Sequence, residues 1–167
     1  MAIGPEPVPE LLEVSITVAE PAWDEAAPDC RDIARAAATA AAAGQLDGDG
    51  AEISILLAGD EVLRELNRRY RGIDASTNVL SFADGTPPPA PGVARLLGDV
   101  AVSLETTRQE AEAEGLEITE HLAHLVIHGV LHLLGYDHET DVDAVVMERL
   151  ETSVLAGLGL KDPYGRG

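Results

Sequence analysis

The chain has 167 residues, of which 46% are hydrophobic and 25% charged, a balance typical of one folded domain rather than of a disordered chain. Its 30 acidic residues outnumber its 11 lysines and arginines, and the formal charge of -19 disfavours a generic surface for nucleic acid or anionic membranes. Aromatic residues make up 3% of the chain, which disfavours a base-stacking platform. The composition therefore favours a function carried by a small cluster of residues rather than by an extended binding surface.

The sequence also limits the compartment and the kinds of metal site. It contains no apolar stretch of the roughly 20 residues that a membrane span needs, and residues 1–10 are acidic and proline-rich, so we expect a cytoplasmic protein without membrane contact. Cys30 is the only cysteine, which excludes a multi-cysteine zinc site and fits a reducing compartment. Any metal must be held by His, Asp or Glu.

The first half of the chain alternates strand and helix patterns. Apolar and polar residues alternate over 12–18, which predicts a strand, and the alanine-rich run 31–43 predicts a helix. A second strand is expected over 53–57. Asp60 is the expected N-cap of a further helix, which Gly72 closes.

The second half contains two short strands and then helices. Strands are expected over 78–82 and 96–102, joined by an exposed loop, 84–92, that contains four prolines. Three helices should follow: one capped by Ser103 and running to Glu114, one over 120–134 capped by Thr119, and one over 141–156.

The helix over 120–134 is apolar nearly all round, which is typical of a buried helix, so we expect it at the centre of the fold. Together these elements predict one α+β domain over residues 1–167, in which a small mixed four-stranded sheet packs with about five helices. Residues 1–10 are expected to form a flexible tail.

Five histidines lie between His121 and His138. His128 and His132 are four residues apart and so share one helical face, and Gly135 allows a left-handed turn that brings His138 back over that face. Three imidazoles leave a fourth tetrahedral position for water or substrate, as in catalytic zinc sites, although Ni²⁺ or Co²⁺ would also fit. We therefore predict one Zn²⁺ per chain; the alternative is three separately hydrogen-bonded polar residues.

Further candidates surround these three histidines. His124 and His121 lie on the same stripe, where they either support the ligands or are ordinary core residues, and Asp137 either orients a ligand imidazole or caps the next turn. The spacing HxxxHxxGxxH equals that of metzincin proteases, but Gly129 stands where those enzymes carry the glutamate that acts as general base. The general base is therefore unassigned.

Four arginines occur between Arg64 and Arg71. A solvated helix face explains Arg64 and Arg68, whereas Arg71, beside Gly72, could direct its guanidinium into a cleft and bind a phosphate.

Four segments together resemble the YbeY family: Leu66–Arg71 (LNRRYR), Thr77–Phe82 (TNVLSF), Leu97–Val100 (LGDV) and the run His128–His138 (HGVLHLLGYDH). The resemblance covers residues 56–159. It implies an α+β fold and a zinc-dependent, single-strand-specific endoribonuclease of ribosomal RNA maturation and ribosome quality control.

By this resemblance His128, His132 and His138 are the metal ligands, and Arg71 acts on the substrate phosphate, so that Arg71 and His128 are the expected catalytic residues. The implied partners are single-stranded rRNA and the small ribosomal subunit with its basic proteins, and no DNA. Two alternatives stay open: a metzincin-like zinc peptidase, and a non-catalytic ribosome assembly factor whose metal is structural.

Overall fold

The computed structural model describes residues 12–46, 49–85 and 90–164. The tail expected over 1–10 lies outside these residues, as does 86–89 within the proline-rich loop. The described residues form four strands and six helices, which in chain order are β1 (Leu12–Val18), α1 (Ala22–Ala26), α2 (Cys30–Ala42), β2 (Ala51–Ala58), α3 (Asp60–Arg71), β3 (Val79–Ala83), β4 (Arg95–Ser103), α4 (Leu104–Glu114), α5 (Ile118–Leu133) and α6 (Asp141–Gly157).

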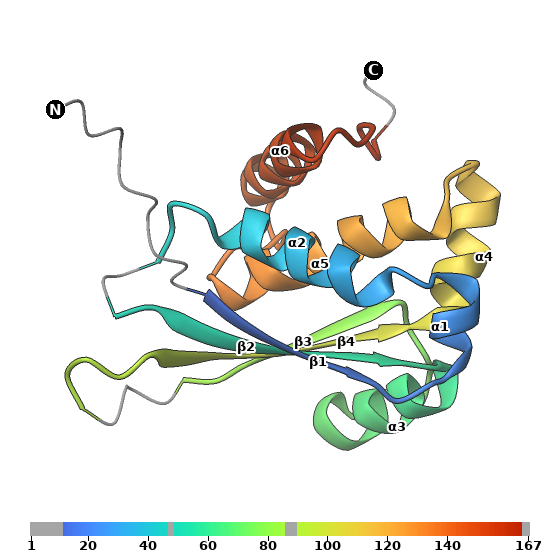
Figure 1. The fold of residues 1–167 in the computed structure, drawn as a ribbon, viewed down its shortest axis with the longest axis horizontal. Helices are drawn as coiled ribbons and strands as arrows, with labels where there is room; N and C mark the ends of the chain where they lie inside the picture. Colours follow the sequence, from blue (N-terminus) through green and yellow to red (C-terminus); the bar gives the residue numbers. More distant parts are fainter. Residues whose placement is uncertain (1–11, 47–48, 86–89, 165–167) are drawn as a thin grey trace, which may run out of the picture.

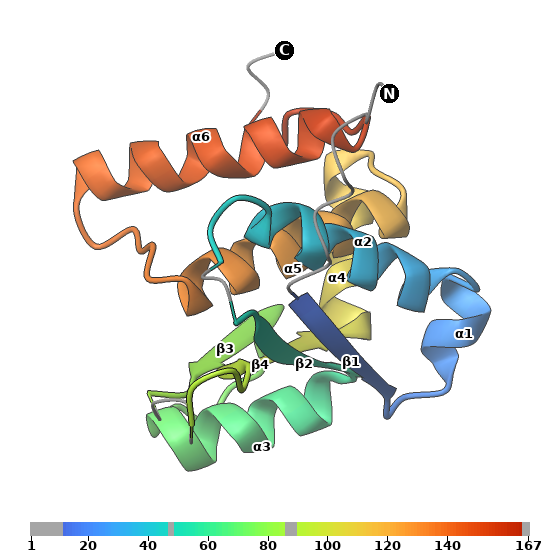
Figure 2. The same ribbon diagram turned by 60° about the vertical axis from the view of Figure 1, so that its left-hand side comes forward.

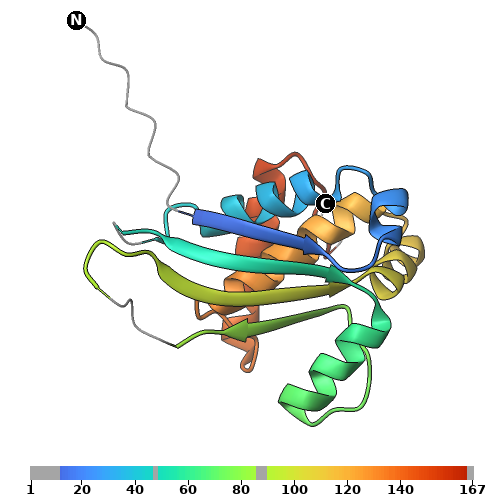
Figure 3. The ribbon, with the colours of Figure 1, turned by 60° about the horizontal axis from the view of Figure 1, so that its bottom comes forward.

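The four strands form one mixed sheet in the order β1-β2-β4-β3. β1, β2 and β4 are parallel, and β3 pairs antiparallel with β4, so that Ser81 lies opposite Val100 (Figure 3). β1 and β2 show the burial pattern of half-covered strands, with alternate side chains buried. The expected small mixed sheet is confirmed.

Helices cover the two faces of this sheet unequally. α2 and α5 lie on one face with α6 beyond them, and α3 lies on the other face (Figures 1 and 2). The main core fills the space between the sheet and the α2–α5 layer, and a second small cluster, Ala58, Leu63, Leu80 and Ala101, lies under α3. α5 is buried along most of its length between sheet and helices, as its apolar circumference predicts.

The structure corrects three local expectations. The N-cap of α3 is Gly59, because the carboxylate of Asp60 instead accepts hydrogen bonds from the hydroxyls of Ser76, Ser103 and Thr106. α5 begins earlier than expected, with Glu117 as N-cap in a reciprocal capping box with Glu120, so Thr119 is not the cap. The first outcome depends on tertiary partners of Asp60, whereas the second depends on a local bond between Glu117 and Glu120.

The third correction is α1, a five-residue helix that raises the count above the expected five. It buries Trp23 completely, and the indole Nε1 donates to the carbonyl of Ala58 at 2.8 Å. The helix is too short to show a periodic pattern in the sequence, and packing of the indole accounts for it.

None of the helices within the described ranges has both the length and the apolarity needed to cross a bilayer.

Candidate metal centre

Three histidines converge where α5 ends. His128 and His132 project from the last two turns of α5, and their Nε2 atoms are 3.1 Å apart. Gly135 has φ 103°, a conformation that L side chains rarely adopt, and the turn it forms returns the chain toward α5. One ligand atom each of His128, His132 and His138 therefore lies within 4.8 Å of the others. This donor set can hold one metal ion.

The three histidines line one cavity together with residues of α3, of β3 and of their own segment. Arg71 comes from the end of α3, Val79, Leu80, Ser81 and Ala83 come from β3, and Leu133, Asp137 and Glu139 come from the end of α5 and the turn after it. The structure thus brings Arg71, the expected phosphate-binding residue, into one cavity with the three expected ligands. The nearest of these ligands in the sequence, His128, is 57 positions from Arg71.

Arg71 is held in place by β3. Its Nη2 donates to the carbonyl of Ser81 at 2.7 Å, and its Cζ lies 5.5 Å from the centroid of the Phe82 ring. The bond to Ser81 uses one of the five N–H donors of the guanidinium. The remaining donors are available to bind an anion in the cavity.

A buried glutamate supports the cluster from α6. Glu151 accepts hydrogen bonds from His128 Nδ1 at 2.5 Å, His124 Nε2 at 2.9 Å and the hydroxyl of Tyr164. Burial raises the pKa of Glu151, but these hydrogen bonds outweigh burial and bring the pKa down to about 2. The carboxylate is therefore ionised at neutral pH and can act only as a hydrogen-bond acceptor.

Glu151 was not among the residues expected from the sequence. A signal existed, because Met147, Glu151 and Leu155 recur at four-residue spacing and all three are buried on one face of α6. A carboxylate on an apolar helix stripe indicates a paired buried group. Its partner on α5 could not be identified without the tertiary fold.

The remaining candidates have different neighbours. His124 contacts Glu151 and so is linked to His128 through the shared carboxylate, whereas His121 lies 3.0 Å from Glu110 on α4. Asp137 accepts a hydrogen bond from the backbone N–H of Glu139 at 3.2 Å, the arrangement of a residue that caps a turn.

The surroundings of His132 favour its neutral imidazole. Burial lowers the pKa of His132, and its neighbours His128 and His138 lower it further, because each would be a like charge when protonated. A neutral imidazole is the form that binds a metal ion.

Gly129 faces the sheet. A Cβ built there would lie 2.7 Å from Cγ1 of Val100 and 3.0 Å from Oγ of Ser81, and this hydroxyl donates to the Gly129 carbonyl. The position that carries the catalytic glutamate in metzincins therefore has no room for any side chain in this structure.

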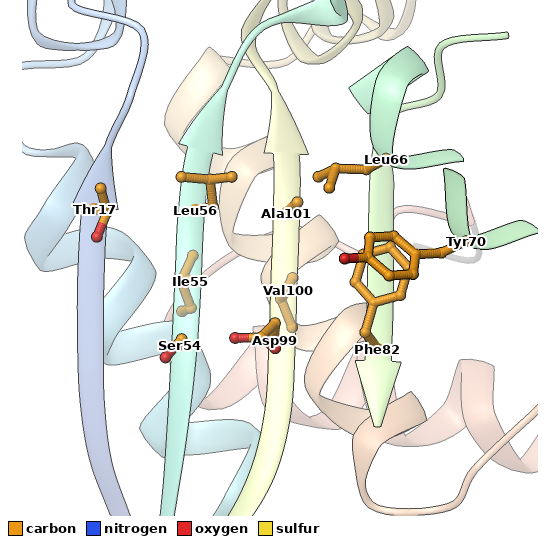
Figure 4. Close-up of a pocket in the computed structure, with 10 residues that line it drawn as sticks. All are labelled: Thr17, Ser54, Ile55, Leu56, Leu66, Tyr70, Phe82, Asp99, Val100 and Ala101. Atoms are coloured by element: carbon orange, nitrogen blue, oxygen red, sulfur yellow. The ribbon is translucent and has the colours of Figure 1, made fainter. Parts of the chain in front are cut away.

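A second cavity lies on the α3 side of the sheet (Figure 4). The rings of Tyr70 and Phe82 meet at 5.4 Å between centroids, and Asp99 projects from β4 beside Ser54 of β2. Burial raises the pKa of Asp99, and the charge of Asp84 adds to this effect. Neither Arg71 nor the three clustered histidines line this cavity, so it is separate from the candidate metal centre.

Comparison with known proteins agrees with the resemblance of the four segments. Residues 17–159 match the model of the family described as Endoribonuclease YbeY. Relatives with that name include a protein of Paramagnetospirillum magneticum, 49% identical over 92% of this chain and 96% of its own, and a protein of Azorhizobium caulinodans, 48% identical over the same shares.

Among solved structures, the solution structure of TM1509 from Thermotoga maritima has the same fold, with a TM-score of 0.51. It covers 92% of this chain and 100% of its own, at 21% sequence identity.

Proposed function

Because this chain belongs to the endoribonuclease YbeY family and is a nuclease of that family, we propose that it hydrolyses single-stranded ribosomal RNA with a zinc ion held by His128, His132 and His138. The observation that carries the proposal is the shared cavity, which contains three convergent imidazoles and the guanidinium of Arg71. A metal position and a phosphate-binding fork within one cavity suit the cleavage of a phosphodiester.

The donor set fits zinc. Three neutral nitrogen ligands leave one tetrahedral position for water or substrate, which is the arrangement of catalytic rather than structural zinc sites. Bound there, Zn²⁺ would supply Lewis acidity, either to activate water or to polarise a phosphoryl oxygen.

Arg71 would bind the scissile phosphate. The Ser81 carbonyl and the Phe82 ring fix the guanidinium, so that few degrees of freedom are lost when an anion binds. Its charge then stabilises the negative charge that develops on the phosphate oxygens during attack. A peptide substrate offers no such anionic group at the reacting centre.

The structure disfavours the peptidase alternative on a second ground. The spacing of the histidines equals that of metzincins, but Gly129 is packed against Val100 and Ser81. The glutamate of those proteases has no counterpart and no space here.

The proposed setting is the small ribosomal subunit in the cytoplasm. A chain with net charge -19 is repelled by RNA at long range but attracted to basic proteins, so its acidic surface would dock on the basic proteins of the particle.

The test pairs metal analysis with cleavage of a single-stranded RNA. The purified chain should carry about one zinc and cleave RNA, chelation should abolish cleavage, and added zinc should restore it. His128→Ala, His132→Ala and His138→Ala should each lose both zinc and activity. His121→Gln is the matched control, because His121 lies on the same helix but contacts Glu110. Stoichiometric zinc in all three alanine variants, or cleavage of peptides in preference to RNA, would refute the proposal.

A further inference from the structure

Glu151 is a carboxylate in the interior of the protein, with 1% of its side chain exposed. It lies on α6, which packs over the α2–α5 layer (Figure 2). Three hydrogen bonds reach its two oxygens from two segments: on α5, His128 Nδ1 donates to Oε1 at 2.5 Å and His124 Nε2 to Oε2 at 2.9 Å, and after α6 the Tyr164 hydroxyl also donates to Oε2.

Stability alone does not account for an acid at this position. Taking a carboxylate out of water costs several kcal/mol, and apolar residues of similar volume often stabilise a core as well or better. The neighbours of Glu151 on its own helix stripe, Met147 and Leu155, show that apolar side chains fill this layer. The carboxylate therefore has a use besides attaching α6 to α5.

The contact with His128 indicates that use. A neutral imidazole carries its proton on one nitrogen and a lone pair on the other, and only the lone pair can bind a metal. A carboxylate at Nδ1 holds the proton there, which leaves the lone pair on Nε2. This Nε2 atom is the one that faces His132, at 3.1 Å from its Nε2.

We propose that Glu151 is a positioning residue of the metal centre, which fixes the tautomer and ring orientation of His128 so that its Nε2 lone pair points to the position shared with His132 and His138. This inference rests on the proposed metal-binding function. His124 and Tyr164 hold the carboxylate in turn, so a residue near the C-terminus supports metal binding on α5 through Glu151. The negative charge also offsets the charge of a divalent cation bound by three neutral ligands.

The experiment measures zinc affinity of the folded protein by competition with a chromophoric chelator, together with the unfolding midpoint of the metal-free protein. Glu151→Gln keeps the size of the side chain but replaces one acceptor by a donor, so it can no longer accept from both histidines. We expect zinc to bind about 10- to 100-fold more weakly, the range typical when a partner of a ligand histidine is removed. The visible spectrum of the Co²⁺-substituted protein should also change, because it senses ligand geometry.

Two further variants keep the test decisive if Glu151→Gln does not fold. Glu151→Asp retains the charge but is one methylene shorter, so it should reach His128 poorly and weaken zinc binding. Tyr164→Phe deletes only the hydroxyl that donates to Glu151 and should weaken zinc binding several-fold in a folded protein. Glu112→Gln is the matched control, because it removes the same charge from an exposed position on α4.

The outcomes separate this inference from the proposed function. If the wild-type chain binds no zinc, or if His132→Ala binds zinc as well as the wild type does, the metal function itself fails. If the wild type needs all three histidines but folded Glu151→Gln and Tyr164→Phe bind zinc with wild-type affinity, Glu151 is only structural and the inference is overturned. A lower unfolding midpoint with unchanged zinc affinity would overturn it equally.

Discussion

Arg71 is tied to β3 by its bond to Ser81, and in the proposed function it also binds the substrate phosphate. Since the Ser81 carbonyl uses a single donor of its fork, Arg71→Ala and Arg71→Lys should keep zinc and the folded state. Both variants should lose about 100-fold or more in kcat/KM for single-stranded RNA, because neither can present a planar pair of donors to the developing charge. Arg108→Ala, which removes an exposed cation from α4, is the control. Equal turnover in all of these proteins would mean that Arg71 has no role in cleavage and is only part of a solvated helix face.

The depressed pKa of His132 has two consequences at acidic pH. A ligand imidazole must be neutral to bind metal, and the folded-state pKa of His132 lies below the ordinary histidine value of about 6.5, so zinc affinity should fall only as the pH drops below about 6.5 toward that lowered pKa. The unfolded chain takes up its proton at a higher pH than the folded chain does, so the metal-free protein should also lose stability below about 6.5. Zinc titrations and chemical denaturation between pH 7 and about 5 measure both effects. An affinity that is flat across this range would contradict the prediction.

At the scale of elements, Gly129 sets how closely α5 approaches the sheet. Alanine would favour the helix by up to about 1 kcal/mol, but its Cβ would lie 2.7 Å from Val100 Cγ1 in a packed interface, and overpacking of this kind costs about 1–3 kcal/mol. We therefore expect Gly129→Ala to reduce the free energy of unfolding, as measured in urea.

Gly157→Ala is the matched control, because a Cβ at this last residue of α6 meets no atom within 4 Å. That variant should be neutral or slightly stabilising. The same packing predicts that Gly129→Glu disrupts the α5–sheet contact and gives no peptidase. A stable Gly129→Glu protein that hydrolyses peptides would contradict both statements.

At the scale of the whole molecule, the charge of -19 conflicts with an RNA substrate unless the contact is small. Two of the four arginines in the segment from Arg64 to Arg71 are paired within the chain: Arg64 with Asp74 and Arg68 with Glu65, each at 2.7 Å. This pairing leaves few cations on α3 for phosphates.

The prediction concerns the salt dependence of RNA binding. Each neutralised phosphate of a single strand contributes a log–log slope of about -0.7, so two or three contacts give a slope near -2 or shallower. Binding to a short naked strand should be weak, and it should strengthen on assembled small subunits, whose basic proteins attract the acidic surface. A slope steeper than about -5, or equal affinity with and without the particle's proteins, would refute this view.

The sequence by itself determined the features that depend on neighbouring residues. Alternation located β1, alanine content located α2, and the spacing of His128, His132 and Gly135 predicted that three imidazoles, including that of His138, meet at one turn. Helical and strand periodicity act over a few residues, so these patterns can be interpreted without the fold.

Only the tertiary structure decided the contacts between distant segments. Glu151 follows His128 by 23 residues with a turn between the two helices, and no spacing rule relates them. Asp60 and Thr119 have ordinary capping side chains, yet Gly59 and Glu117 cap the two helices, and α1 forms where Trp23 is buried. For Asp60 and for Trp23 the deciding partners are supplied by the fold, and these contacts outweigh a local preference of about 1 kcal/mol, whereas Glu117 caps its helix through a local bond with Glu120.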